Sequence, residues 1–146
     1  MIQNIHFFQE EITYTIKQKI LLRQWLTSSI SAEGFNTGNI NIIICSDSFL
    51  HKMNKEYLNH DALTDIITFD NSENEIISGD LFISIERIRE NANVFSKKII
   101  DELHRVIVHG VLHLIGFGDK TYLEKDEMTK KENIYLLRRP DKLKVS

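Results

Sequence analysis

Residues 99–120 read IIDELHRVIVHGVLHLIGFGDK, and this stretch decides the fold. Residues 99–115 are the longest apolar segment with helical periodicity, so they predict a helix that is buried over much of its surface. Gly116 follows directly, and glycine often ends a helix because it adopts a left-handed conformation without steric cost. The stretch therefore predicts a buried helix that ends in a sharp turn.

The segments around this helix alternate between apolar and amphipathic patterns. Strands are predicted at residues 1–8, 40–45, 65–70 and 79–86, with a turn at 34–39 and a polar connection at 71–78. Further helices are predicted at 15–30, 46–58, 87–95 and 122–139, and Ser46 or Asp47 is the expected cap of the second. Because the strands are few and mixed with helices, we expect an α+β fold or a small α/β layer.

Length, charge and cysteine content narrow the classes of protein that the chain can represent. With 146 residues, the natural expectation is a single domain spanning 1–146. The net charge of -3 provides no global attraction for a polyanion, so a nucleic-acid partner would need a local basic patch. Cys45 is the only cysteine, which excludes an internal disulfide and a cysteine-rich zinc site, and no disulfide-linked partner is expected. It ends an apolar run, so we interpret it as a small core residue.

The sequence carries no signal for membrane insertion or secretion. The first residues lack a basic region followed by a long apolar run, and no segment approaches 18 uninterrupted apolar residues. We therefore expect a cytoplasmic protein without a membrane partner.

Two histidines and an aspartate have the spacing of a metal site. His109 and His113 are four residues apart, so they project from the same face of the predicted helix. The turn at Gly116 allows Asp119 to approach the same point. Two histidines and one carboxylate form a known open zinc site that keeps a position for water. The alternative is that both histidines lie on a buried helix face and bind backbone carbonyls.

The same spacing is close to that of a zinc protease, H-E-x-x-H-x-x-G-x-x-H, but two positions differ. Gly110 replaces the catalytic glutamate and Asp119 replaces the third histidine. Without that glutamate, proteolysis lacks its general base. Gly110 has two explanations that remain open: a group approaches the helix backbone beside the metal, or the helix packs tightly against another element. His104 lies off the face of His109 and is a poor ligand.

Several segments resemble the YbeY family, bacterial metal-dependent endoribonucleases linked to ribosomal RNA maturation. HGVLHLIGF at 109–117 resembles the family signature H-G-x-L-H-L-x-G-[YF]-D-H. MNKEYLNHDALTDIITFD at 53–70 resembles the segment LN-x-x-Y-R-x-x-D-x-x-T-D-V-L-S-F. GDLFIS at 79–84 and DEMTKKE at 126–132 are similar to a strand and an acidic segment of the family. All four segments occur in the family's order.

This resemblance implies a small mixed β-sheet flanked by helices, with a metal-bearing helix across it. It implies one Zn²⁺ ion per chain, held by His109 and His113, with Asp119 standing at the position of the family's last histidine. The implied function is a single-strand-specific endoribonuclease acting in ribosomal RNA maturation and ribosome quality control, with ribosomal RNA or a ribosomal subunit as its partner. The alternatives are a metal-containing ribosome assembly or RNA-binding factor without significant turnover, and a hydrolase of peptides or small amides.

The chain departs from the family pattern at Leu58, which stands where the family has an arginine thought to assist RNA chemistry. Arg105 or His60 are candidates to replace it, and Lys130 and Lys131 are further options, although charged runs are usually exposed helix faces.

Other polar residues allow two interpretations. Thr64 and Asp65 are expected either to contact substrate or to cap a turn. Asp80 is expected either to accept a hydrogen bond from a metal-bound imidazole or to close a turn. Arg105 and Asp80 are the candidate catalytic residues, and the sequence identifies no general base.

Overall fold

The computed structural model describes residues 4–59 and 64–145, and it contains a mixed four-stranded sheet. The strands are β1 (Ile5–Glu10), β2 (Asn36–Cys45), β3 (Ile66–Asp70) and β4 (Ile76–Ser84), in the order β1-β2-β4-β3. β1 and β4 both run parallel to β2, and β3 runs antiparallel to β4. The expected α+β class with a small mixed sheet is confirmed.

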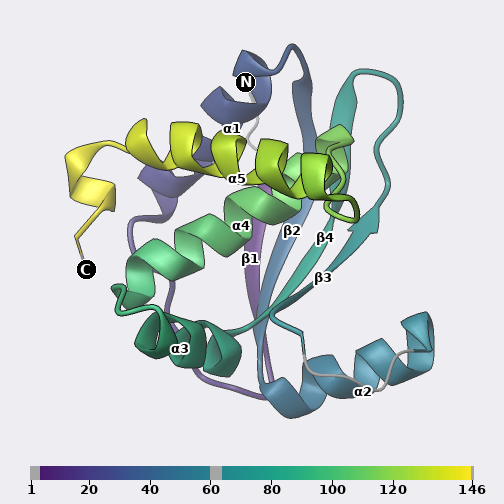
Figure 1. Cartoon of the computed structure of the whole chain (residues 1–146), viewed down its shortest axis with the longest axis vertical. Helices are drawn as coiled ribbons and strands as arrows, with labels where there is room; N and C mark the ends of the chain where they lie inside the picture. Colours follow the sequence, from purple (N-terminus) through teal and green to yellow (C-terminus); the bar gives the residue numbers. More distant parts are fainter. Residues whose placement is uncertain (1–3, 60–63, 146) are drawn as a thin grey trace.

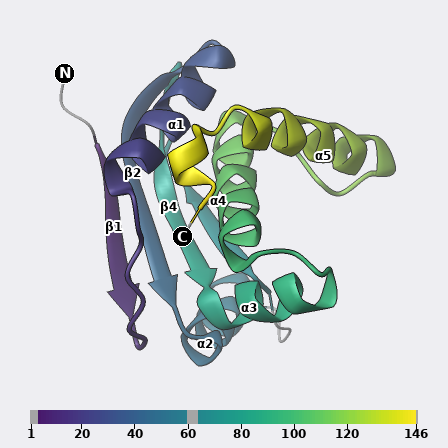
Figure 2. The ribbon, with the colours of Figure 1, turned by 90° about the vertical axis from the view of Figure 1, so that its left-hand side faces the viewer.

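Helices cover both faces of the sheet. They are α1 (Lys19–Ala32), α2 (Asp47–Leu58), α3 (Ile85–Val94), α4 (Ile99–Ile115) and α5 (Tyr122–Leu137), and a short 3₁₀ helix, η1 (Asp141–Leu143), follows. α1 and α4 pack on one face, and α5 lies on the outer side of α4 (Figures 1 and 2). α2 contacts β3 and β4 and contributes to a smaller apolar cluster. The helix predicted at 99–115 is therefore confirmed, and it lies across β3 and β4.

Gly110 allows α4 to approach the sheet closely. A Cβ atom at this position would lie 2.7 Å from Cδ1 of Ile66 on β3 and 3.0 Å from a methyl carbon of Leu81 on β4. Both distances are shorter than normal packing, so a Cβ atom at this position would force the ends of the Ile66 and Leu81 side chains to shift. Of the two explanations for Gly110, the structure supports tight packing against other elements.

The residues that cap the start of α2 and the end of α4 are those that the sequence predicts. The Ser46 hydroxyl accepts a hydrogen bond from the Phe49 backbone N–H at the start of α2, as expected for an N-cap. Gly116 has φ of 122° after α4, and its N–H donates to the carbonyls of Leu112 and His113. Its role as the end of α4 is confirmed.

Several element boundaries differ from the prediction, and two of them have a clear structural cause. The turn predicted at 34–39 is largely strand, because β2 begins at Asn36, whose N–H donates to the carbonyl of Glu75. Gly38 fits there because a Cβ at this position would overlap Oγ of Ser78. The strand predicted at 79–86 instead ends at Ser84, whose hydroxyl accepts from the N–H of Arg87 and starts α3. The first difference arises from pairing between distant segments, and the second arises from a local helix cap.

Cys45 is fully buried, in agreement with its interpretation as a core residue. Burial raises the pKa of its thiol to about 12, which leaves it protonated and unreactive at neutral pH.

Across residues 4–59 and 64–145, none of the helices combines the length and the apolar character that crossing a bilayer requires.

Candidate metal centre

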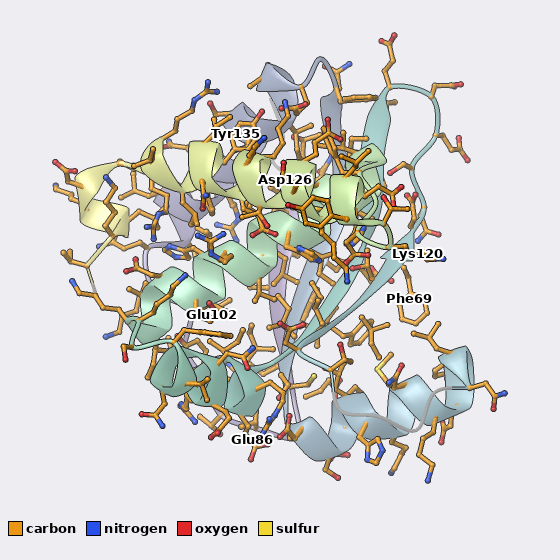
Figure 3. All side chains as sticks on the ribbon, in the orientation of Figure 1. Phe69, Glu86, Glu102, Lys120, Asp126 and Tyr135 are labelled. Atoms are coloured by element: carbon orange, nitrogen blue, oxygen red, sulfur yellow. The ribbon has the colours of Figure 1, made fainter. Side chains whose placement is uncertain are left out.

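The two histidines of α4 converge on a single point. Their rings lie on the same helix face with centroids 4.6 Å apart, and the two Nε2 atoms are 3.0 Å apart. After Gly116 the chain turns back through the loop that carries Lys120, labelled in Figure 3. This turn places Oδ2 of Asp119 3.1 Å from Nε2 of His113 and 3.4 Å from Nε2 of His109. The structure thus brings together the three residues proposed as ligands.

The hydrogen bonds of the opposite ring nitrogens assign the tautomers. Nδ1 of His113 lies 2.9 Å from the backbone carbonyl oxygen of Phe117, and Nδ1 of His109 lies 2.6 Å from Oε2 of Glu132. A carbonyl and a carboxylate oxygen only accept, so both Nδ1 atoms carry hydrogen in the neutral rings. Both Nε2 atoms then present lone pairs to each other and to the Asp119 carboxylate. Three acceptors facing one point require a cation or a proton between them.

The spacing of these acceptors fits zinc. Ligand atoms arranged tetrahedrally about 2.05 Å from zinc lie about 3.3 Å from one another. The three measured separations, 3.0, 3.1 and 3.4 Å, are close to that value. The side chains of His109, His113 and Asp119 are 23%, 26% and 41% exposed, so a fourth position faces solvent. The residues therefore fit a metal site that is open to a substrate.

Glu132 on α5 is a site residue that the sequence did not reveal. It is buried, and its second oxygen accepts a hydrogen bond from Nη1 of Arg105 at 2.7 Å. Nη2 of Arg105 donates to Oδ1 of Asn133, also at 2.7 Å. Arg105 therefore orients His109 through Glu132, and its guanidinium is occupied by α5. The signal for Glu132 was its helical spacing from Met128 and Leu136, which are both buried.

Charges around His109 shift its acid–base equilibrium. Burial lowers the pKa of His109, but the hydrogen bond and charge of Glu132, together with Asp119 and Asp65, raise it above the usual value. Burial raises the pKa of Asp65, and the His109 charge opposes that change. Asp65 therefore lies near enough to His109 for their charges to interact.

Asp80, a candidate catalytic residue, lies apart from the convergent histidines. Asp80 accepts a hydrogen bond from Nδ2 of Asn41 at 2.9 Å. It alternates along β4 with Leu81, which meets α4, so its side chain points to the opposite face of the sheet. The acceptors of both Nδ1 atoms are other groups, so Asp80 orients neither imidazole.

The substrate-binding candidates lie at the start of β3. The Thr64 hydroxyl donates to the carbonyl of Ile66 at 3.3 Å, and the Asp65 carboxylate accepts from Asn91 at 3.5 Å. His60 lies outside the described residues. Leu58 ends α2 and is 43% exposed.

The lysine alternatives have carboxylate partners. Lys130 pairs with Asp126 one turn earlier on α5, at 2.9 Å, and is largely exposed. Lys131 pairs with Glu33 at 3.0 Å. Neither lysine contacts the three convergent residues.

His104 belongs to the core rather than to the metal centre. It is buried against Trp25, and Nδ1 lies 2.8 Å from Nη1 of Arg139. Burial and the Arg139 charge lower its pKa to about 3, so it is neutral at physiological pH. Its predicted absence from the ligand set agrees with this position.

The chain is similar to a protein family, to several individual proteins and to a solved structure. The family model described as "Endoribonuclease YbeY" matches residues 4–139. A protein named "Endoribonuclease YbeY" from Amoebophilus asiaticus is 45% identical, with 92% of each chain covered. One of the same name from Cytophaga hutchinsonii is 46% identical, covering 92% of this chain and 94% of the relative. A solution structure of a Thermotoga maritima protein has a TM-score of 0.64 and 26% identity, covering 90% of this chain and 86% of that one.

Proposed function

The chain belongs to the YbeY family of endoribonucleases, and we propose that it is a single-domain, zinc-dependent hydrolase that cleaves single-stranded ribosomal RNA. The observation that carries this proposal is the convergence of His109, His113 and Asp119 at a solvent-facing point. We further propose a cytoplasmic role in ribosomal RNA maturation and quality control, with the ribosomal subunit as the partner.

The ligand chemistry suits phosphodiester hydrolysis. Zinc held by His109, His113 and Asp119 would supply Lewis acidity, which polarises a phosphoryl oxygen and lowers the pKa of a bound water toward about 7. Glu132 accepts a hydrogen bond from Nδ1–H of His109 and so keeps the Nε2 lone pair directed at the site. Arg105 offsets the charge of Glu132 and fixes its position. These residues orient the ligands of the proposed metal.

Two residues beside the centre are proposed to contact the substrate. Asp65 interacts electrostatically with His109, and Thr64 immediately precedes it. A hydroxyl and a carboxyl group at this position suit hydrogen bonds to ribose hydroxyls of a single strand. His60 remains a candidate from the sequence alone.

Incubation of the full chain with a single-stranded fragment of ribosomal RNA tests the proposal. We expect internal cleavage that stops when a chelator removes the metal and resumes when zinc is restored. His113→Ala is expected to abolish cleavage, and a fully paired duplex of the same sequence should resist. Cleavage that persists in His113→Ala with a chelator present would contradict the proposal.

The alternative is a metal-containing RNA-binding or assembly factor without significant turnover, and Leu58 favours it. An exposed leucine stands where the family pattern has an arginine, and leucine offers no charge to a phosphate. A zinc-loaded chain that binds RNA and leaves it intact would support this alternative. Leu58→Arg distinguishes the cases further, because a nuclease that lacks only this cation should cleave faster with it restored.

A further inference from the structure

A groove of about 620 Å³ runs between the N-terminal half of α4 and the C-terminal half of α5. In Figure 1 these two helix halves both lie on the side of the molecule where the C-terminus is. Its cationic lining residues are Lys97, Lys98, Arg105, Arg139 and Lys144, and its lining includes one acidic residue, Asp101. The lining of the groove thus carries more basic than acidic side chains, although the whole chain has a net charge of -3.

Two of these cations are available to an anionic ligand. Arg105 pairs with Glu132, Arg139 with Asp101, and Lys144 with Asp141. Within the described ranges, the ammonium groups of Lys97 and Lys98 have no carboxylate within 4.0 Å. Both side chains are exposed where α4 begins, so they are free to bind phosphate oxygens.

The groove lies on the N-terminal side of the metal centre along α4, and its lining includes none of His109, His113 and Asp119. Arg105 lines it and lies one turn before His109, at an axial distance of about 6 Å. Lys98 lies eleven residues before His109, at an axial distance of about 16 Å. The axial distance between Arg105 and Lys98 is therefore about 10 Å, roughly the length of three phosphates in a stacked strand at about 3.4 Å each.

We propose that this groove binds the phosphate backbone of the RNA strand on one side of the cleaved bond. The identity of the ligand rests on the proposed function, whereas the charge of the groove and its position along α4 from the metal centre are features of the structure. The nine described lining residues include no aromatic ring on which a base could stack. Binding is therefore electrostatic and indifferent to base sequence.

Charge-matched variants test the proposal. Lys97→Glu/Lys98→Glu reverses the two free cations, and Lys17→Glu/Lys19→Glu makes the same charge change beside the edge strand β1. Affinity for a fluorescent single-stranded RNA oligonucleotide is measured by anisotropy at several salt concentrations, with KM and kcat for cleavage of the same RNA. Lys97→Gln/Lys98→Gln is measured in parallel in case the double reversal affects folding, which circular dichroism reports.

We expect the groove variants to bind RNA at least roughly 20-fold more weakly at 0.1 M salt, and the salt slope to fall by about 1.4, or 0.7 for each phosphate that is no longer neutralised. KM should rise by more than kcat falls. Equal weakening in the groove and control variants, or no weakening in either, overturns the proposal. If the wild-type chain binds RNA through the groove but leaves it uncut, the groove stands and the proposed function fails. If the wild-type chain cleaves RNA and the groove variants keep its KM, the groove fails alone.

Discussion

The carboxylate of Glu132 on α5 lies 2.6 Å from Nδ1 of His109 on α4. This contact determines which ring nitrogen carries the proton, and therefore which nitrogen faces the convergent acceptors. A carboxylate behind the histidine also makes Nε2 a stronger donor of electrons to a metal. The geometry of the site thus depends on two helices, although its histidines belong to one.

Removal of this carboxylate should weaken metal binding. We expect Glu132→Ala to lower zinc affinity about 10- to 100-fold, because His109 loses its orienting acceptor and Arg105 loses its partner. Glu132→Gln keeps an acceptor oxygen without the charge, so its loss should be smaller. Competition with a chromogenic chelator measures both. Glu127→Ala, on an exposed position of the same helix, is the control. Equal affinity in Glu132→Ala and the control would show that Glu132 does not support the site.

Asp119 can be tested by two substitutions of opposite effect. Asp119→Asn keeps the size but removes the charge, so zinc retention should fall. Asp119→His should restore retention, because a three-histidine set also suits tetrahedral zinc. Metal analysis and thermal unfolding are measured on one sample. A turn residue without a ligand role would tolerate asparagine, so equal zinc content in Asp119→Asn and the wild type would refute the assignment.

Metal affinity should depend on pH through His109. Protons compete with zinc for the imidazole, and the raised pKa of His109 means that this competition begins above pH 6.5 during acidification. In the metal-free chain acidification has the opposite effect, because protonation of His109 stabilises the fold. The raised folded-state pKa contributes stability below pH 6.5 that is lost as pH rises through that folded value.

Zinc titrations and chemical unfolding across about pH 5–9 check these two trends. Glu132→Gln should move the loss of zinc affinity to lower pH, because it removes the hydrogen bond and charge that raise the His109 pKa. An unchanged pH profile in this variant would exclude Glu132 as the cause.

Gly110→Ala should destabilise the fold. Overpacking of this kind costs roughly 1–3 kcal/mol, whereas the helix propensity of alanine returns about 1 kcal/mol. Denaturant unfolding measures the difference. The new methyl group would meet Cδ1 of Ile66, so Ile66→Val removes the colliding atom. The double variant should therefore be more stable than the sum of the two single changes predicts, and simple additivity would argue against the collision.

The sequence was most informative where the chemistry is local. The bounds Ile99–Ile115 of α4 follow from the sequence because this is the longest and most apolar segment with helical periodicity and Gly116 directly follows it. The approach of Asp119 to the histidines follows from the same turn. These features need only helical periodicity and the conformational freedom of glycine.

Features that depend on distant segments were missed. Asn36 and Thr37 have the sequence character of a turn, but they pair with Ile76 and Ile77 of β4, whose position in the sheet the sequence does not specify. Glu132 resembled an exposed residue because it ends the charged run DEMTKKE. Its burial results from the packing of α5 on α4, and only the helical spacing from Met128 gave a local sign of it.

The attachment of α5 to the rest of the molecule has a kinetic consequence. Besides three buried side chains with apolar surface, Met128, Tyr135 and Leu136, polar contacts hold this helix. Among these, Trp25 donates to the carbonyl of Tyr135 at 2.8 Å, and Lys131 pairs with Glu33. Ionic contacts weaken as salt screens them, so α5 should separate from α4 more often in concentrated salt. Each separation would withdraw Glu132 from His109, so we expect a bound zinc ion to dissociate faster at high salt.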